Sequence, residues 1–245
     1  SQLNPIRISN PLSEFLSFKE SSGALKGEPN FGNDQIKLLD RRLDARLKEV
    51  DLNLQSLFSY LKKSGLESTT AVILCADHGF QYMGRGRPLL SETRVNVPLL
   101  IKHPKLESED ISSFVNLGLD IGPTIANMFN IVLPSKDGRV VLPNDEIKPR
   151  DKVIIESIFG DRYKVCIRTT DYVFHQHVEY NGETHTIDMN KEVEIFLFEA
   201  GNEELDNNLV ESKLDVVEKM RSFVIEHLAR SADQILWKNK PDVKD

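Results

Sequence analysis

The chain has 245 residues, of which 40% are hydrophobic and 28% charged, and its formal net charge is −7. This length permits a sizeable core, as one large domain or a domain with a subdomain, and the composition is that of an ordinary globular protein. The negative charge gives no electrostatic reason to expect nucleic acid or an anionic membrane surface as a partner. No apolar run approaches the roughly 18 residues that a membrane span needs. Cys75 and Cys166 neither build a disulfide framework nor exclude one bond, so they leave the compartment undecided.

Residues 1–33 are rich in Pro, Gly, Ser and Asn and show no sustained hydrophobic period, which predicts a connector or loop. The sequence begins with Ser1 and lacks the charged-then-apolar layout of a signal peptide. We therefore expect it to start in mid-protein.

A long amphipathic helix is predicted from Asp34, and Gly65 is expected to end it. Its apolar residues follow steps of three and four and form one stripe. We expect this stripe to pack on a sheet rather than in a coiled coil, because its heptad regularity is short. The stripe consists of Ile36, Leu39, Leu43, Leu47, Val50, Leu54, Leu57 and Leu61.

Two short apolar runs, 69–76 and 96–101, are predicted strands. The first is continuous and rich in β-branched residues, which is typical of a strand covered on both faces, as in a parallel sheet. The second has Pro98 near its start, where no ladder donor is needed. A helix is expected to follow, with Asp120 as its N-cap and Pro123 in its first turn.

From about residue 150, strand-like runs follow one another closely, with Asn181-Gly182 as a hairpin-turn signal, and an amphipathic helix is predicted over 209–236. The predicted fold class is α/β: the later strands of a mixed sheet with flanking helices, then a small antiparallel sheet and a C-terminal helix. We expect the α/β part to cover residues 34–148 and the antiparallel subdomain to cover 149–245.

Asp77-His78-Gly79 directly follows the first predicted strand. Ligands of open α/β sheets bind beyond the carboxyl ends of the strands. A carboxylate followed at once by an imidazole offers two metal ligands on a tight turn, and Gly79 lets the backbone leave sharply. The same tripeptide could equally be a capping Asp beside an unrelated His.

Arg85 and Arg87 lie on the loop that leaves this turn. A guanidinium can bind a tetrahedral oxyanion through two parallel hydrogen bonds and stays charged at any working pH. Beside a metal-type pair, the two arginines predict an anion site, whereas arginines alone would indicate only a solvated loop.

In the segments around this turn and beyond it, the sequence resembles the sulfatases of the alkaline phosphatase superfamily. The similarity extends in unbroken order over about residues 38–236. It is carried by an L-x-x-x-G-L-x-x-x-T segment leading to a D-[NH]-G turn, by GRGRPLLSETRVNVPLLIKHP, by LDIGPTIANMFNIVLP, by Asp137-Gly138-Arg139, and by EIFLFEAGNEELDNNLVE.

The resemblance implies a metal-dependent hydrolase of sulfate esters. It makes Asp77 and His78 the metal ligands of the second ligand cluster. Arg87, five residues before Glu92, falls where the family usually has a lysine that contacts the sulfate. The change from Lys to Arg keeps the charge but alters the geometry. The implied metal is Ca²⁺, with Mg²⁺ next.

Several family elements do not occur in this sequence. The nucleophile motif C-x-P-S-R, whose cysteine becomes formylglycine, is absent, and no histidine precedes His78. The early Asp-Asp ligand pair is missing too. We therefore expect this chain to be the C-terminal half of such an enzyme, to be inactive alone, and to need an N-terminal half that carries the formylglycine.

Two other functions remain open. One is a phosphate-handling relative, such as a phosphodiesterase or phosphoethanolamine transferase; these use two zinc ions and a further histidine in the loop after D-H-G, and residues 79–95 contain none. The other is a non-catalytic binding module. The expected partners are a sulfate-ester small molecule or glycan and the missing half, with self-association through an uncovered sheet edge.

Overall fold

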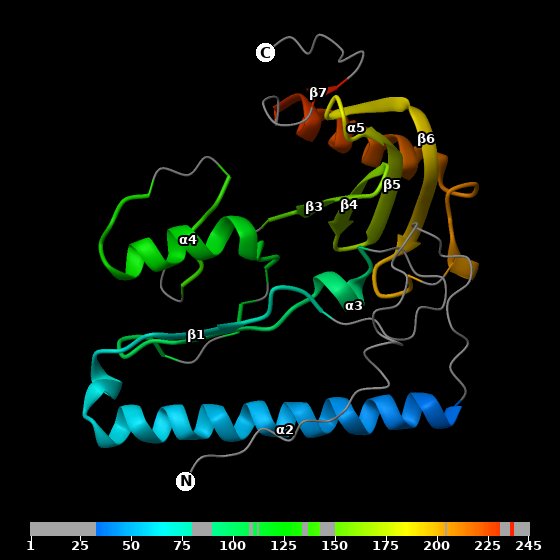
Figure 1. Cartoon of the computed structure of the whole chain (residues 1–245). Coiled ribbons are helices and arrows are strands. Elements are labelled where there is room, and N and C mark those ends of the chain that lie inside the picture. The colour runs from blue at the N-terminus through cyan, green and yellow to red at the C-terminus, as the bar shows by residue number, and fades with distance from the viewer. Residues whose placement is uncertain are drawn as a thin grey trace.

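The structure is a computed structural model, and it is α/β, with its elements stacked in layers (Figure 1). A five-stranded sheet covered by α5 (Leu214–Arg230) lies at one end, and α3 (Glu92–Val95) and α4 (Leu117–Met128) lie beneath it. The two-stranded sheet of β1 (Val72–Cys75) and β2 (Leu99–Lys102) and the long helix α2 (Asn33–Lys63) follow. The structure describes residues 33–79, 90–107, 110–111, 113–133, 137–142, 150–203, 205–230 and 236–237. No helix in these ranges is long and apolar enough to cross a membrane.

Helix α2 (Asn33–Lys63) forms as predicted, and the chain leaves it at Gly65, whose φ of 73° is in the left-handed region. Gly65 N–H donates to the Lys62 carbonyl at 3.2 Å, which closes the last turn. The 3-10 turn η1 (Leu66–Ser68) then leads to β1. The predicted end of this helix is confirmed.

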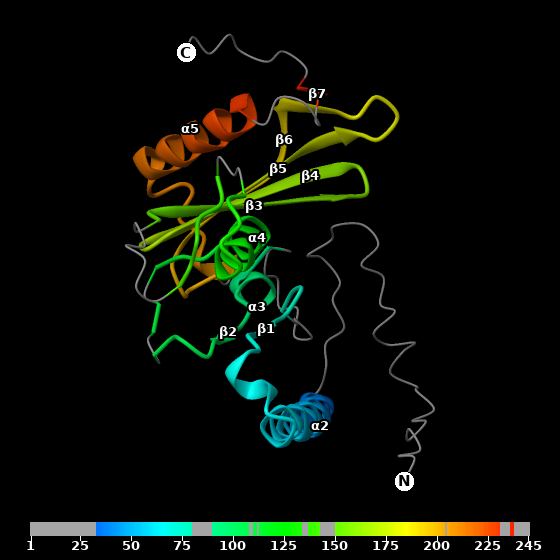
Figure 2. The same cartoon turned by 90° about the vertical axis from the view of Figure 1, so that its left-hand side faces the viewer.

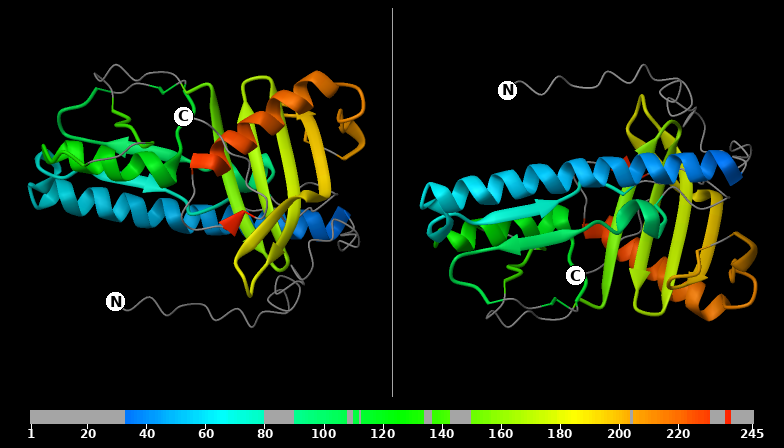
Figure 3. Two further views of the ribbon diagram at one scale, coloured as in Figure 1. Left: turned by 90° about the horizontal axis from the view of Figure 1, so that it is seen from above. Right: turned by 90° about the horizontal axis from the view of Figure 1, so that it is seen from below.

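The apolar stripe of α2 is covered only in part. Leu39 and Leu61 are buried, but Leu43, Leu47 and Val50 are at least 40% exposed. Figure 3 shows why: α2 runs alongside β1 and β2 and extends well past them. A helix of this length spans about 46 Å, whereas a four-residue strand spans about 13 Å. Two such strands cannot cover the whole stripe.

Strands β1 (Val72–Cys75) and β2 (Leu99–Lys102) are shorter than predicted and form a two-stranded antiparallel sheet. The expectation that the first strand is covered on both faces, as in a parallel sheet, is wrong for the described residues. Val72 pairs with Lys102 and Cys75 pairs with Leu99, and no residue of β1 is fully buried. A β-branched run therefore marked the strand correctly but did not reveal the direction of its partner.

Helix α4 (Leu117–Met128) begins three residues before the predicted N-cap, with Asn116 in that position. Asp120 lies in the first turn, where its Oδ2 accepts the backbone N–H of Asn116 at 2.8 Å. Asp120 Oδ1 accepts the backbone N–H of Arg139 at 3.1 Å, and Arg150 donates to both oxygens, at 2.5 and 2.9 Å. Asp120 is thus not the N-cap; it is a 1%-exposed anchor that ties α4 to two segments that follow it.

Burial opposes ionisation of Asp120, but the hydrogen bonds from Arg150, Asn116 and Arg139 outweigh it and hold its pKa below the usual 3.8. A carboxyl whose pKa is lowered by folding stabilises the protein above its unfolded-state pKa, and this contribution is lost as the pH falls through the folded-state value.

We expect Asp120→Asn to lower the free energy of unfolding by about 3 kcal/mol at pH 7, because it leaves the partly buried Arg150 without its anion. Urea denaturation followed by circular dichroism measures this. The variant should also lose less stability than the native chain when the pH falls below about 4. A native-like stability at pH 7 would contradict the role of this anchor.

The second part of the chain is an antiparallel sheet in the order β3-β4-β5-β6, to which the two-residue strand β7 (Leu236–Trp237) adds in parallel. The strands are β3 (Lys152–Phe159), β4 (Arg162–Thr169), β5 (Tyr172–Asn181) and β6 (Thr186–Glu199). The predicted hairpin at Asn181-Gly182 is confirmed, since Asn181 pairs with Thr186. Residues 186–199 form the single long strand β6, whose pairing with β5 is irregular around Val178.

Alternation along these strands gives the sheet two distinct faces. One face is apolar and packs against α5 (Leu214–Arg230), which covers it in Figure 2. Tyr163, Phe174 and Leu197 are buried there with Val217 and Val224. The opposite face carries buried polar and charged side chains, and α3 packs against part of it.

Candidate functional site

The Asp77-His78-Gly79 turn leaves the carboxyl end of β1, where the sequence predicted it. Both side chains are exposed, Asp77 by 89% and His78 by 62%. Asp77 Oδ1 accepts the backbone N–H of His78 at 2.9 Å, which leaves Oδ2 free of any hydrogen bond that the structure describes. The turn is therefore open to solvent at the end of β1.

The ring of His78 has a defined tautomer. Its Nδ1 lies 2.8 Å from the Gly79 carbonyl oxygen, which can only accept, so Nδ1 carries the proton. In the neutral ring Nε2 therefore presents its lone pair, 3.8 Å from Asp77 Oδ2. A carboxylate oxygen and an imidazole nitrogen thus lie side by side toward solvent, which is the arrangement of a metal-ligand pair.

Gly79 holds the turn against helix α3 (Glu92–Val95). Its backbone N–H donates to the Arg94 carbonyl at 2.7 Å. A Cβ at this position would lie 2.1 Å from the Thr93 carbonyl oxygen, so only glycine permits this contact. The sequence predicted that Gly79 lets the backbone turn sharply after His78. In the structure, Gly79 is required because the backbone of α3 lies so close to it.

We expect Gly79→Ala to lower the free energy of unfolding by about 1–3 kcal/mol, because the methyl group must push Thr93 away and break the bond to Arg94. Thermal and urea denaturation measure the loss. Gly182→Ala is the matched control, since its Cβ would meet nothing closer than 3.9 Å, from Tyr180. Equal stabilities of the two variants would contradict the close approach.

Helix α3 is itself attached to the polar face of the second sheet. Leu90 and Val95 pack on Cys166 and Val173. The backbone N–H of Glu92 donates to Glu203 Oε2 at 3.2 Å, across a separation of 111 residues. The turn after β1 therefore depends on contacts made by a distant part of the chain.

Glu203 is 4% exposed and is held as an anion by its neighbours. Burial opposes its ionisation, but hydrogen bonds from His175 and Arg168 outweigh this and lower its pKa. Arg168 Nη2 lies 2.6 Å from Glu203 Oε1, and His175 Nε2 lies 3.5 Å from Oε2. Burial lowers the pKa of His175 to about 4, so His175 is neutral near pH 7.

The arginines, cysteines and remaining histidines of the sequence differ in how the structure places them. Arg85 and Arg87 lie outside the described residues, so the sulfate contact expected of Arg87 stays a prediction. Both cysteines are free thiols, with Cys75 exposed and Cys166 buried. Two histidines of β5, His175 and His177, are buried.

Sequence reasoning missed Glu203 and Arg168. Arg168 carried a usable signal, because it continues the alternation of Lys164 and Cys166 along a strand whose intervening residues are apolar. A charge at such a position needs a buried partner. Nothing in the sequence around Glu203 identified it as that partner.

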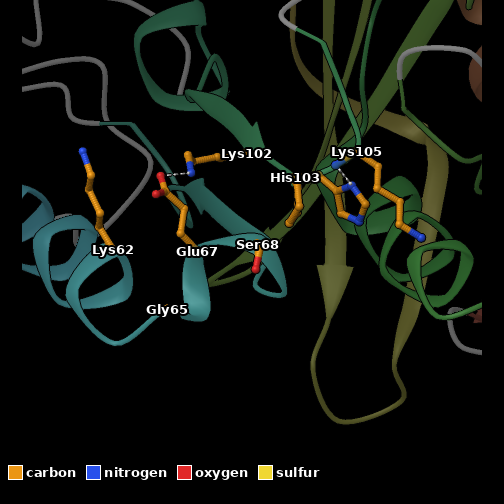
Figure 4. A pocket seen from close by; sticks show the side chains of 8 residues that line it. Lys62, Gly65, Glu67, Ser68, Lys102, His103 and Lys105 are labelled. Carbon is orange, nitrogen blue, oxygen red and sulfur yellow. Dashed lines mark hydrogen bonds and ion pairs between the residues drawn. The ribbon is translucent and has the colours of Figure 1, made fainter.

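An open groove of about 560 Å³ lies at the other end of the β1–β2 sheet (Figure 4). Lys62, Lys102, His103 and Lys105 line it, and Lys102 is bound to Glu67 at 2.9 Å. Since β1 and β2 are antiparallel, this groove is at the opposite end from Asp77 and is separate from the candidate site.

Comparison with known proteins agrees with the motifs. The sequence model of the Sulfatase family matches residues 18–131, which include the Asp77-His78-Gly79 turn and α3. This segment of the chain is thus similar to the sulfatases. The chain is also 30% identical over 112 residues to the extracellular sulfatase SULF-1 homolog of Drosophila melanogaster, a match that covers 43% of this chain and 10% of that relative.

The family match ends before β3, so the sulfatase-like segment and the second sheet meet at the contacts between α3 and β4–β5. Within the described ranges, no group of three or more His, Cys, Asp or Glu side chains lies close enough to hold a metal ion. The described part of the sulfatase-like segment thus places Asp77 and His78 together, with no third side chain of these types close enough to form a metal-binding group with them.

Proposed function

We propose that the chain is part of a sulfatase-type hydrolase that cleaves sulfate esters with a bound divalent cation, and that Asp77 and His78 are two ligands of that cation. One observation carries this proposal: the free Asp77 Oδ2 and the lone pair of His78 Nε2 lie 3.8 Å apart at the exposed end of β1. Ligand distances of about 2.3–2.6 Å around Ca²⁺ allow one ion to contact both atoms.

The proposed cation is Ca²⁺, or else Mg²⁺, because a carboxylate and water oxygens suit these hard ions. When bound, such a cation would polarise an oxygen of the sulfate group. Asp77 supplies the negative charge that attracts the ion. His78 supplies a neutral donor whose orientation is fixed by its bond to the Gly79 carbonyl. Arg87 is proposed to bind the sulfate oxygens from the loop that follows.

The substrate is proposed to be a sulfate-ester small molecule or glycan. The attacking group is proposed to be a formylglycine outside this chain, since the sequence contains no C-x-P-S-R. The match of residues 18–131 to the sulfatase family and the resemblance of the motifs support this part of the proposal.

Titration with Ca²⁺ tests the ligand pair. We expect weak, saturable binding in the millimolar range, because water must fill most of the coordination sites. The amide signals of Asp77 and His78 in two-dimensional NMR spectra should shift, whereas those of β5 should not. Asp77→Ala should abolish the shifts, and Asp188→Ala, which removes a half-buried carboxylate on β6, should leave them unchanged. Identical shifts in the Asp77→Ala variant would contradict the assignment.

Activity provides a second test. We expect the isolated chain to show no saturable hydrolysis of a chromogenic aryl sulfate, with or without Ca²⁺, because it lacks the nucleophile. Turnover that disappears in the Asp77→Ala variant would contradict this expectation. A chain that neither turns over substrate nor binds Ca²⁺ would instead support the non-catalytic binding module.

Large apolar side chains are exposed both on α2 and after α4. Leu47, Val50 and Leu57 on α2, and Phe129 and Val132 after α4, are between 42% and 91% exposed. An apolar surface of this kind in a protein marks a place of association. We propose that a further sulfatase-type segment, the expected N-terminal half, covers it.

Without that segment we expect the isolated chain to self-associate, because its apolar surface is exposed to water. Sedimentation velocity at tens of micromolar should show species larger than a monomer. Replacing Leu47 and Val50 together with Glu should shift the distribution to the monomer, whereas the same change at the polar positions Gln55 and Ser56 should not. A strictly monomeric native chain would contradict an uncovered surface.

A further inference from the structure

The first residue of helix α3 is hydrogen-bonded to a carboxylate that lies far along the chain. Its N-cap, Ser91, makes no capping hydrogen bond through its side chain. Glu203 instead accepts the backbone N–H of Glu92 at 3.2 Å. A carboxylate at the first N–H of a helix satisfies a donor that otherwise lacks a partner in the helix.

The position of Glu203 depends in turn on Arg168. Arg168 Nη2 lies 2.6 Å from Glu203 Oε1 and 3.7 Å from Glu92 Oε2, so it lies between the two carboxylates. Its side chain is 11% exposed, and that of Glu203 is 2% exposed. Two buried charges of opposite sign hold each other in a fixed geometry, because neither can turn toward water.

The other end of α3 holds the Asp77-His78-Gly79 turn. The Arg94 carbonyl accepts the Gly79 N–H at 2.7 Å, and the Gly79 carbonyl accepts Nδ1–H of His78 at 2.8 Å. A continuous set of contacts thus leads from β4, through Glu203 and α3, to the imidazole ring.

We propose that Glu203 and Arg168 are positioning residues that set the place of Asp77 and His78 through α3. Their role as positioning residues rests on the proposed function, in which Asp77 and His78 bind the cation. The structural coupling of Glu203 and Arg168 to the turn through α3 does not depend on that function. Apolar contacts of Leu90 and Val95 attach α3 to the sheet without a preferred direction. The hydrogen bond to Glu203 is directional, so it fixes where along the sheet α3 sits.

Hydrogen exchange at the Gly79 amide, measured by NMR, reports the coupling directly, because this amide is bonded to Arg94 of α3. We expect Glu203→Ala and Arg168→Met to speed its exchange at least tenfold, while the amide of Phe174 in β5 stays protected. Arg168→Lys keeps the charge but can bind only one oxygen at a time, so it should restore part of the protection.

Glu194→Gln is the matched control. Glu194 lies on the same polar face, bound to His177 at 2.9 Å, but no contact with α3 is described for it. Its loss should leave the Gly79 exchange rate unchanged. If Glu194→Gln speeds exchange as much as Glu203→Ala does, the effect is general destabilisation and the proposal fails.

Thiol labelling shows whether α3 has moved. Cys166 is fully buried and packs with Leu90 in one cluster, so it should react with a thiol reagent only when α3 lifts. In a Cys75→Ser background, we expect Glu203→Ala and Arg168→Met to speed labelling of Cys166 together with exchange at Gly79. Faster labelling with unchanged Gly79 exchange would overturn the proposal, as would no change in either. Neither hydrogen exchange nor thiol labelling depends on cation binding. A failed Ca²⁺ titration would therefore contradict the proposed function without contradicting the coupling through α3.

Discussion

The hydrogen bond from the Gly79 amide to the Arg94 carbonyl joins the two segments on which the candidate site depends. Residues 76–79 leave one strand and α3 precedes the next, and their backbones approach so closely that a side chain at residue 79 would clash with Thr93. Such an approach fixes the backbone on both sides of it. The exposed Asp77 and His78 therefore project from a rigid base, although they lie on a surface turn.

This base extends into the second sheet. An antiparallel sheet needs only one apolar face to form a core with a helix. Here α5 covers that face. The opposite face is free to carry charge, and it does: Arg168 and Glu203 are buried there as a pair. Buried charges cost free energy unless each is matched, so their presence indicates a geometric role as much as a stabilising one. The sulfatase-like segment ends before this sheet, yet its turn is held by it.

Much of the architecture could be predicted from periodicity and turn residues. The helix that ends at Gly65, the hairpin at Asn181 and the succession of strands after 150 all follow from local preferences, which the tertiary structure did not override. The Asp77-His78 turn could be placed because it follows a strand directly. The direction of β2 against β1 could not be predicted, since apolar runs do not encode the direction of pairing. The role of Asp120 was misjudged because its partner Arg150 is 30 residues away. Glu203 was missed for the same reason, as local patterns carry no information about long-range ion pairs.

The proposed cation site requires that His78 Nε2 is unprotonated and presents its lone pair beside Asp77. Long-range ¹⁵N–¹H correlation spectra of the imidazole at pH 8 measure the tautomer directly. We expect a proton on Nδ1 and an unprotonated Nε2 in the absence of metal, with a change of the Nε2 chemical shift when Ca²⁺ is added. Asp77→Ala should leave the tautomer unchanged and remove the response to Ca²⁺. A proton on Nε2 in the native chain would contradict the proposed site. The nitrogen that faces Asp77 would then be a hydrogen-bond donor and could not bind a metal ion.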